Sequence, residues 1–129
     1  MRILIVGAGE VGSSIAANLA DTHEIVVVDV DPERVDSLTY GEDVLAILGD
    51  GTDLAVLEEA SVKEADLVIA STDSDTINLA ITGTVDTISD AFTIARVEDT
   101  TFLETWRRSE GAFGVDFMVS TNLLAAQVI

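Results

Sequence analysis

Residues 2–12 read RILIVGAGEVG, an apolar run that leads directly into a G-x-G-x-x-G loop. The run Arg2–Val6 predicts a buried strand, and Val11, Ile15 and Leu19, each four residues apart, predict one apolar face of a following helix. Alone, the glycine hexapeptide is a weak signal, because glycines also serve turns and close packing. Placed between a strand and a helix, it predicts a turn that holds phosphate groups.

The rest of the chain repeats this alternation of short apolar runs and helical patterns, which is typical of βαβ units and a parallel sheet. Predicted strands are Arg2–Val6, Glu24–Asp29, Val44–Leu48, Leu67–Ala70, Phe92–Val97 and Val115–Val119. Predicted helices are Val11–Leu19, one begun by Asp31-Pro32-Glu33, one from Asp53, one from about Asp75 through Ile81, Thr101–Arg108 and Thr121–Ile129. We expect an α/β fold: a Rossmann-type, doubly wound, parallel six-stranded sheet with strand order 3-2-1-4-5-6, in one domain over residues 1–129 whose final helix is truncated.

The charge balance is strongly acidic: 24 Asp and Glu against 6 Lys and Arg give a formal net charge of −18. Because 48% of the residues are apolar, the acid coats a real core rather than a disordered tail. A polyanion repels nucleic acid and anionic membrane surfaces, so neither is an expected partner. Lys63 is the only lysine, and we interpret the charge as halophilic, with an acidic mesophilic protein as the alternative.

Two absences from the sequence narrow the function further. The chain has no cysteine, which excludes disulfides, thiolate nucleophiles and cysteine-bound metals. No apolar run approaches the ~20 residues that span a bilayer, and the chain enters its first strand at once, without the pattern of a signal peptide. We therefore expect a cytoplasmic protein with no direct membrane insertion.

The glycine loop and the end of the second strand together predict a dinucleotide site. Gly7 permits the tight turn, Gly9 lets the backbone approach a pyrophosphate, and Gly12 allows the helix to pack closely. Asp29 ends the second strand 17 residues after Gly12, where a carboxylate accepts hydrogen bonds from ribose hydroxyls. The competing interpretation is a tight turn followed by a solvated aspartate.

Asp29 also bears on which nucleotide binds. The 2′-phosphate of NADP would meet the negative charge of Asp29, and no basic residue nearer in sequence than Arg34 offsets that charge. NAD(H) or an adenosine nucleotide is therefore favoured over NADP.

Several further motifs resemble those of the Trk-type RCK domains, also called KTN or TrkA-N domains, which are cytoplasmic nucleotide-binding regulators of potassium channels and transporters. The likeness runs from Arg2 to about Ala126, and its most particular elements are the GDGTD loop and the pair Asp75 and Asn78. The matching segments are residues 7–12 (GAGEVG), 28–34 (VDVDPER), 49–53 (GDGTD), 65–72 (ADLVIAST), 94–97 (IARV) and 114–116 (GVD).

The resemblance implies a cofactor site built at the carboxyl ends of the strands. Residues 7–12 hold the phosphates, Asp29 holds the adenosine ribose, and residues 50–52 border the adenine. Residues 71–73 face the second ribose and the nicotinamide, and Arg96 offers charge to a phosphate. The implied cofactor-binding residues are Gly7, Ala8, Gly9, Glu10, Val11, Gly12, Asp29, Val30, Asp50, Gly51, Thr52, Ser71, Thr72, Asp73, Asn78 and Arg96.

Alternatives remain open for some of these residues. Asp50 and Asp53 also suit turn and N-cap duty, which we favour for Asp53. Asn78 lies within a predicted helix and is as well suited to packing or capping as to ligand contact. ATP-responsive members of the family carry an arginine in the glycine loop where this chain has Glu10, so ATP and ADP are disfavoured.

The resemblance implies a regulator rather than an enzyme: an NAD(H)-binding domain that controls potassium transport through nucleotide-dependent conformational change. Its expected partners are a membrane-embedded potassium channel or transporter subunit and a second copy, in a homodimer or higher ring, with Leu123, Leu124 and Val128 forming an apolar stripe. The alternatives are a fragment of an NAD-dependent dehydrogenase and a nucleotide-binding module unrelated to transport. We identify no catalytic or metal-binding residue, and we expect the one histidine, His23, at the amino end of the sheet, away from any ligand.

Overall fold

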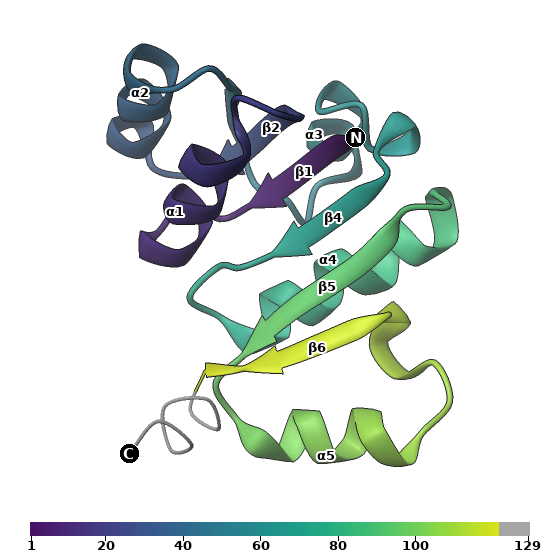
Figure 1. Ribbon diagram of the computed structural model, residues 1–129. Coiled ribbons are helices and arrows are strands. Elements are labelled where there is room, and N and C mark those ends of the chain that lie inside the picture. Colours follow the sequence, from purple (N-terminus) through teal and green to yellow (C-terminus); the bar gives the residue numbers. More distant parts are fainter. Residues whose placement is uncertain (122–129) are drawn as a thin grey trace.

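The computed structural model describes residues 1–121 and contains a six-stranded sheet whose neighbouring strands are all parallel. The strand order is β3-β2-β1-β4-β5-β6, so the predicted Rossmann-type architecture is confirmed (Figure 1). The strands are β1 (Arg2–Val6), β2 (Glu24–Asp29), β3 (Leu45–Leu48), β4 (Leu67–Ala70), β5 (Phe92–Val97) and β6 (Phe117–Ser120). The helices are α1 (Glu10–Leu19), α2 (Pro32–Gly41), α3 (Leu54–Glu59), α4 (Asp75–Ile88) and α5 (Thr100–Arg108), with short 3-10 turns η1 (Val62–Glu64) and η2 (Ala112–Gly114).

The central strands are covered on both faces, which explains why β1 is apolar at successive positions. Ile3 and Ile5 pack with the cluster beneath α1 and α2, whereas Leu4 and Val6 pack with the cluster beneath α3 and α4. Figure 1 shows α1 and α2 on one side of the sheet and α4 on the other. A third cluster joins α4 and α5 to β5 and β6. The helices thus fix the strands so that the carboxyl ends of β1, β2, β3 and β4 lie together.

Helix starts follow the predicted capping chemistry. Asp31 caps α2 by accepting a hydrogen bond from the backbone N–H of Glu33 at 2.9 Å, with Pro32 as the first helical residue. Asp53 caps α3 by accepting from the N–H of Ala55 at 2.9 Å, which confirms the structural interpretation of that aspartate.

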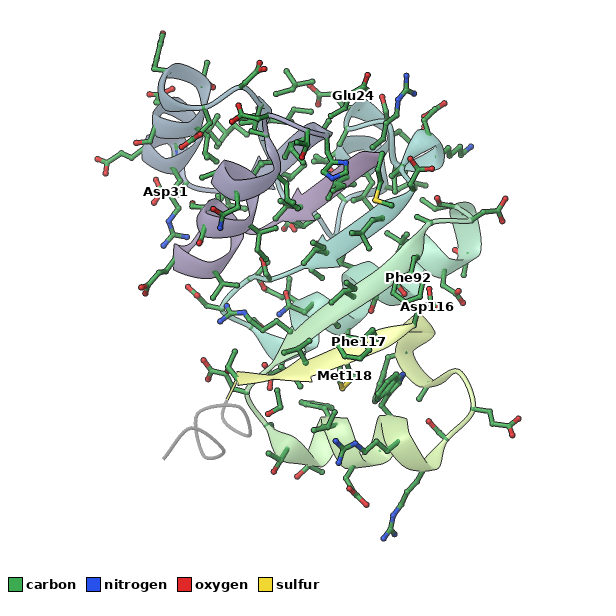
Figure 2. The ribbon with its side chains drawn as sticks, viewed as in Figure 1. Glu24, Asp31, Phe92, Asp116, Phe117 and Met118 are labelled. Carbon is green, nitrogen blue, oxygen red and sulfur yellow. The ribbon has the colours of Figure 1, made fainter. Side chains whose placement is uncertain are left out.

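The last strand starts later than predicted, at Phe117 rather than Val115. Val115 directly follows the η2 turn. Its carbonyl accepts a hydrogen bond from the indole N–H of Trp106 on α5 at 2.8 Å, rather than from a neighbouring strand. The carboxylate of Asp116 accepts from the N–H of Thr93 at 2.8 Å, which joins the start of β6 to β5 (Figure 2). Small shifts also occur at β3, α1 and α5, each by one residue.

Helix α4 is longer than predicted and continues past Ile81 to Ile88. The extension is stabilised by Thr82, which is buried and whose hydroxyl donates to the carbonyl of Phe113 in η2 at 3.0 Å. This contact joins residues 31 positions apart in the chain, so local sequence signals did not predict it.

The predicted final helix Thr121–Ile129, including Leu123, Leu124 and Val128, lies outside the described residues apart from Thr121. The single-domain boundary and the homodimer therefore stay predictions. Within residues 1–121, no helix is both long enough and apolar enough to cross a bilayer.

Candidate functional site

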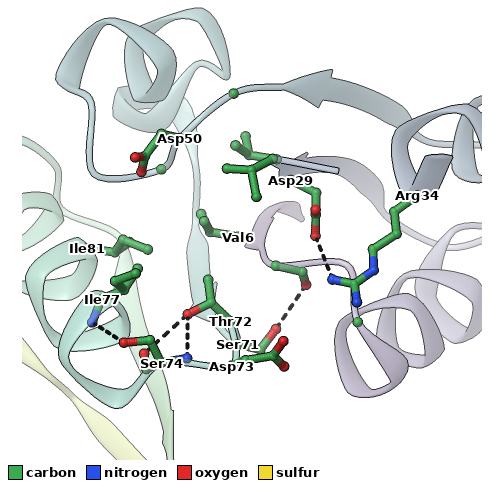
Figure 3. Close-up of a pocket in the computed structure, with 16 residues that line it drawn as sticks. Val6, Asp29, Arg34, Asp50, Ser71, Thr72, Asp73, Ser74, Ile77 and Ile81 are labelled. Atoms are coloured by element: carbon green, nitrogen blue, oxygen red, sulfur yellow. Dashed lines mark hydrogen bonds and ion pairs between the residues drawn. The ribbon is translucent and has the colours of Figure 1, made fainter. Parts of the chain in front are cut away.

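A cavity of ≈ 250 Å³ opens at the carboxyl ends of β1, β2, β3 and β4 (Figure 3). It lies where the strand order reverses, between β1 with its neighbour β2 on one side and β4 on the other. Open α/β sheets bind ligands at such a switch point. The lining residues are Val6, Gly7, Gly9, Val28, Asp29, Val30, Arg34, Gly49, Asp50, Gly51, Ser71, Thr72, Asp73, Ser74, Ile77 and Ile81.

The three glycines of the loop after β1 have distinct roles. Gly7 has a φ of +105°, and a Cβ there would lie 2.7 Å from the backbone of Ser71 and Thr72. A Cβ on Gly12 would lie 1.9 Å from the carbonyl oxygen of Gly7, so this glycine lets α1 pack against the loop itself. At Gly9 the nearest atom to a Cβ would be Nη1 of Arg34, 4.0 Å away. Gly7 and Gly12 therefore shape the loop, and Gly9 faces open space in the cavity.

The amino terminus of α1 suits an anion. Its N-cap is Gly9, which has no side chain to occupy the N–H groups of the first turn. Those groups, together with the helix dipole, favour a negatively charged ligand. This helix terminus therefore suits a phosphate, and the phosphate role of the loop stays a prediction.

Not every residue of the predicted phosphate loop faces the cavity. Glu10 and Val11 are exposed and lie outside the cavity lining, and Gly12 is buried beneath the loop. The N–H of Ala8 donates instead to the carboxylate of Asp29 at 2.5 Å. These four residues therefore lie outside the cavity lining: Glu10 and Val11 are exposed on α1, whereas Ala8 and Gly12 are buried.

Asp29 ends β2 with its side chain only 3% exposed. Its Oδ2 accepts from the N–H of Ala8 and its Oδ1 accepts from the N–H of Asp31 at 2.8 Å. Nη1 of Arg34 lies 3.7 Å from Oδ2. The alternative of a solvated aspartate is thus wrong: Asp29 is a buried carboxylate that ties the glycine loop to the turn before α2, and it still lines the cavity.

The loop after β3 contributes Asp50 at the cavity rim. Its Oδ1 accepts from the backbone N–H of Thr52 at 2.9 Å and from the hydroxyl of Thr52 at 2.7 Å, and these bonds lower the pKa of the Asp50 carboxyl. Thr52 itself lies outside the lining, where it supports Asp50. Gly51 is buried, and a Cβ there would approach Cγ1 of Val6 to 2.3 Å. The loop therefore presents one ionised carboxylate on a closely packed backbone.

The loop after β4 is held by Asn78, which is 1% exposed and does not line the cavity. Its Oδ1 accepts from the N–H of Thr72 at 2.8 Å and from the hydroxyl of Thr72 at 2.7 Å. Its Nδ2 donates to the carbonyl of Arg96 at 2.7 Å and to that of Thr72 at 3.1 Å. Asn78 is therefore a positioning residue: of the two interpretations left open by the sequence, the structure places it in packing rather than in ligand contact.

Arg96 is also placed behind this loop rather than in the cavity. Its Nη2 donates to the carbonyl of Thr72 at 3.0 Å and to that of Ser71 at 3.3 Å, and it lies 3.9 Å from the carboxylate of Asp73. The predicted contact between Arg96 and a phosphate does not fit this placement, because the guanidinium is engaged by backbone carbonyls outside the cavity lining.

Sequence reasoning missed several lining residues. Arg34 follows Asp29 by five positions, on the first turn of α2, and lines the cavity, although its sequence position indicates only the nearest basic charge. Ile77 and Ile81 are four apart on α4, a spacing that places them on one helix face, and Ser74 is the N-cap of that helix. The remaining unpredicted residues are Val6, Val28 and Gly49.

The amino ends of the strands lie at the opposite end of the sheet from this cavity. His23 lies there, beside Arg2 and Asp66, as predicted. Among the described residues, no cluster of His, Asp and Glu has the arrangement of a metal site.

A family model supports the resemblance that the motifs suggested. The model of the TrkA-N domain matches residues 3–121. The chain belongs to the TrkA-N family. Over 127 residues this TrkA-N chain is 33% identical to the Trk system potassium uptake protein TrkA homolog of Archaeoglobus fulgidus, a match that covers 98% of this chain and 29% of the relative. The chain thus spans less than a third of that relative's length.

Solved structures agree with the family assignment. The TrkA-N domain of the inner membrane protein ybaL from Escherichia coli has a TM-score of 0.87 at 23% identity, covering 98% of this chain and 92% of that one, which shows the fold. The GsuK channel bound to NAD has a TM-score of 0.78 at 27% identity, over 92% of this chain and 21% of that one. GsuK bound to ADP has a TM-score of 0.79 at 27% identity, over 92% and 31%.

Proposed function

We propose that this TrkA-N chain is a nucleotide-binding regulatory domain for potassium transport and that NAD(H) is its preferred ligand. The observation that carries the proposal is the cavity at the switch point, where the uncapped amino terminus of α1 faces open space beside a buried carboxylate, Asp29. The first feature suits a pyrophosphate, and the second suits ribose hydroxyls.

The shape of the lining favours a dinucleotide. The cavity extends from Asp29 and Asp50 on the β2 and β3 side to Ser71 and Ser74 on the β4 side, with Gly9 between them. A pyrophosphate at Gly9 would send one nucleoside toward each side. The adenosine half would occupy the β2 side, and the nicotinamide half would meet the polar loop after β4.

The relatives support the same ligand class. GsuK has been solved with NAD and with ADP, and the Archaeoglobus relative is named for potassium uptake. We infer for this chain a nucleotide ligand and a membrane-embedded potassium channel or transporter subunit as partner, with a cytoplasmic location. The ADP complex keeps a mononucleotide as the competing ligand, although Glu10 replaces the loop arginine expected for ATP.

Regulation without turnover fits the groups around the cavity. The charged side chains that line it are Asp29, Arg34, Asp50 and Asp73, and the described lining includes no histidine, lysine or tyrosine to move a proton to or from a substrate carbonyl. When bound, NAD(H) would supply a redox-sensitive nicotinamide, while the chain's own residues bind and orient it. A dehydrogenase fragment would need a proton donor from outside these lining residues.

Hydrogen bonds offer a route from the cavity to the outer helices. The loop after β4 is bonded to Asn78 of α4, and Asp75 of the same helix accepts from the N–H groups of Glu98 and Asp99 at 2.8 and 2.9 Å, just before α5. A nucleotide that bears on the β4 loop would thereby bias α4 and α5. Occupancy shifts a conformational equilibrium only if affinity differs between the two states, so the two arrangements must bind NAD(H) unequally.

Isothermal titration calorimetry at high KCl tests the ligand assignment. We expect NADH or NAD⁺ to bind more tightly than ATP and ADP, and well above NADPH. Incubation with NADH and candidate carbonyl substrates should leave absorbance of the reduced nicotinamide unchanged. A tighter complex with ATP than with NADH would overturn the NAD(H) assignment, and binding of no adenine nucleotide would overturn the proposed function.

A further inference from the structure

Arg34 lies at the cavity on the first turn of α2, and its guanidinium makes only long contacts there. Nη1 lies 3.7 Å from Oδ2 of Asp29, and Nε lies 3.7 Å from Oδ2 of Asp31. Both distances exceed those of good N–H···O hydrogen bonds. Among the described residues the guanidinium donates no hydrogen bond, although it carries five N–H donors.

Asp29 does not depend on this arginine. Both of its oxygens already accept backbone N–H groups, from Ala8 and Asp31. Figure 3 shows the side chain of Arg34 reaching from α2 toward Asp29, with the cavity beside them. A ligand group that drew Arg34 away would therefore leave the Asp29 carboxylate hydrogen-bonded and in place.

The charged side chains that line the cavity are mostly acidic, and Arg34 opposes them. It is the one cationic side chain in the described lining, against the carboxylates Asp29, Asp50 and Asp73. Its Nη1 also lies 4.0 Å from the position of a Cβ on Gly9, beside the loop that faces the open cavity. A phosphate that enters this cavity is repelled by the three carboxylates and attracted by two groups: the amino terminus of α1 and Arg34. The planar guanidinium fork suits phosphate oxygens.

We propose that Arg34 is a phosphate-contacting, specificity-determining residue of this site, which exchanges its long contact with Asp29 for a phosphate of the bound nucleotide. The inference rests on the proposed nucleotide-binding function. The phosphate belongs either to the pyrophosphate, shared by ADP and NADH, or to the 2′-position of NADPH. Because Arg34 lies 3.7 Å from Asp29, the carboxylate rejects a 2′-phosphate less strongly than its charge alone implies.

Calorimetry on the purified chain tests this with Arg34→Gln and the matched control Arg108→Gln. Arg108 lies on α5, pairs with Glu104 alone among residues 1–121, and its side chain is 81% exposed, so the same charge is removed away from the cavity. We expect Arg34→Gln to weaken ADP and NADH by about tenfold and to leave adenosine unchanged. Arg108→Gln should leave all three as in the wild type. A larger loss for NADPH than for NADH would assign the contact to the 2′-phosphate, and equal losses would assign it to the pyrophosphate.

Two further measurements test the contact between Arg34 and a phosphate: the affinity of Arg34→Lys and the salt dependence of ADP binding. Arg34→Lys retains the charge without the fork and should lie between wild type and Arg34→Gln. The salt dependence of ADP binding should be shallower in Arg34→Gln, because one screened ion pair is gone. Wild-type affinity of Arg34→Gln for ADP, NADH and NADPH, in a variant with an unchanged circular dichroism spectrum, would overturn the inference while the proposed function stands. Failure of the wild type to bind any of them would overturn both.

Discussion

The two sides of the cavity are built by different chemistry. On the β2 side, Asp29 and Arg34 face each other across 3.7 Å, and the arginine is 44% exposed. On the β4 side, the buried Asn78 makes four short hydrogen bonds, and Arg96, 19% exposed, donates to two carbonyls of the loop. Two arginines near one cavity thus have opposite roles. The β2 side thus carries a loosely paired, half-exposed arginine at the cavity, whereas the β4 loop is held in place by the hydrogen bonds of Asn78 and Arg96.

A change in salt concentration should give the largest effect, because salt screens the charges of the whole protein, including those on both sides of the cavity. Self-repulsion at a net charge of −18 predicts that the melting temperature rises steeply between about 0.1 M and about 3 M KCl, as the Debye length falls to about 3 Å. Thermal melts followed by circular dichroism measure this. A melting temperature that hardly changes would contradict the halophilic interpretation, which stays a prediction.

Asn78→Ala should give the largest effect of a single substitution and should strike the β4 side. Loss of its hydrogen bonds leaves the part-buried N–H of Thr72 and the part-buried carbonyl of Arg96 without this partner, at an expected cost of about 3 kcal/mol in the free energy of unfolding. Urea denaturation measures it. Asn18→Ala, at an exposed position on α1, is the control and should change stability by less than about 0.5 kcal/mol. Equal stabilities of the two variants would remove the distinction between the sides.

Asp29→Ala should affect both stability and binding, because this residue faces the cavity and also holds the glycine loop. We expect a loss of about 1 to 3 kcal/mol in NADH binding, and a loss of similar size in stability from the freed N–H groups of Ala8 and Asp31. Calorimetry and urea denaturation separate the two losses. Unchanged stability together with weakened binding would mean that Asp29 serves the ligand alone.

A pair of glycine substitutions separates packing from ligand approach. Gly51→Ala places a Cβ 2.3 Å from Val6 and should destabilise the fold by about 1 to 2 kcal/mol. Gly9→Ala enters open space, so the fold should keep its stability within about 0.5 kcal/mol while nucleotide affinity falls. The same two assays apply. If Gly9→Ala binds NADH as the wild type does, the pyrophosphate does not approach that backbone.

The smallest effect concerns pH at the rim of the cavity. Hydrogen bonds from Thr52 lower the pKa of Asp50 in the folded state, so its contribution to stability is present above the unfolded pKa of about 3.9 and is lost as pH falls through the lower folded value. Because Asp50 is exposed, Thr52→Val should reduce this acid-sensitive contribution by less than about 0.5 kcal/mol. Urea denaturation between about pH 5 and pH 2 measures it. A loss in Thr52→Val that is as large in acid as at neutral pH would contradict the assignment to ionised Asp50.

Much of the cavity was predictable because its signals are local. Gly7, Gly9 and Asp29 follow directly from strand ends, and a carboxyl-end site follows from the parallel sheet. The signal for Arg34 is also local: on the first turn of α2, its long side chain reaches back to Asp29 at the end of β2. Asn78 and Arg96 were harder to predict, because their side chains bond to groups distant in the sequence: Asn78 to the Arg96 carbonyl, 18 positions away, and Arg96 to the carbonyls of Ser71 and Thr72, 25 and 24 positions away.

The sequence by itself determined the sheet, its strand order and the position of the ligand cavity, because hydrophobic period, capping residues and glycine spacing act over a few residues and over each βαβ unit. Only the tertiary structure decided which polar side chains face that cavity. The carboxylate of Asp29 is buried, and the guanidinium of Arg96 donates to the carbonyls of the β4 loop. Arg34 makes only long ion pairs, with Asp29 and Asp31. The physical reason is that a polar group's role depends on which hydrogen-bond partners the folded strands bring within about 3 Å of it.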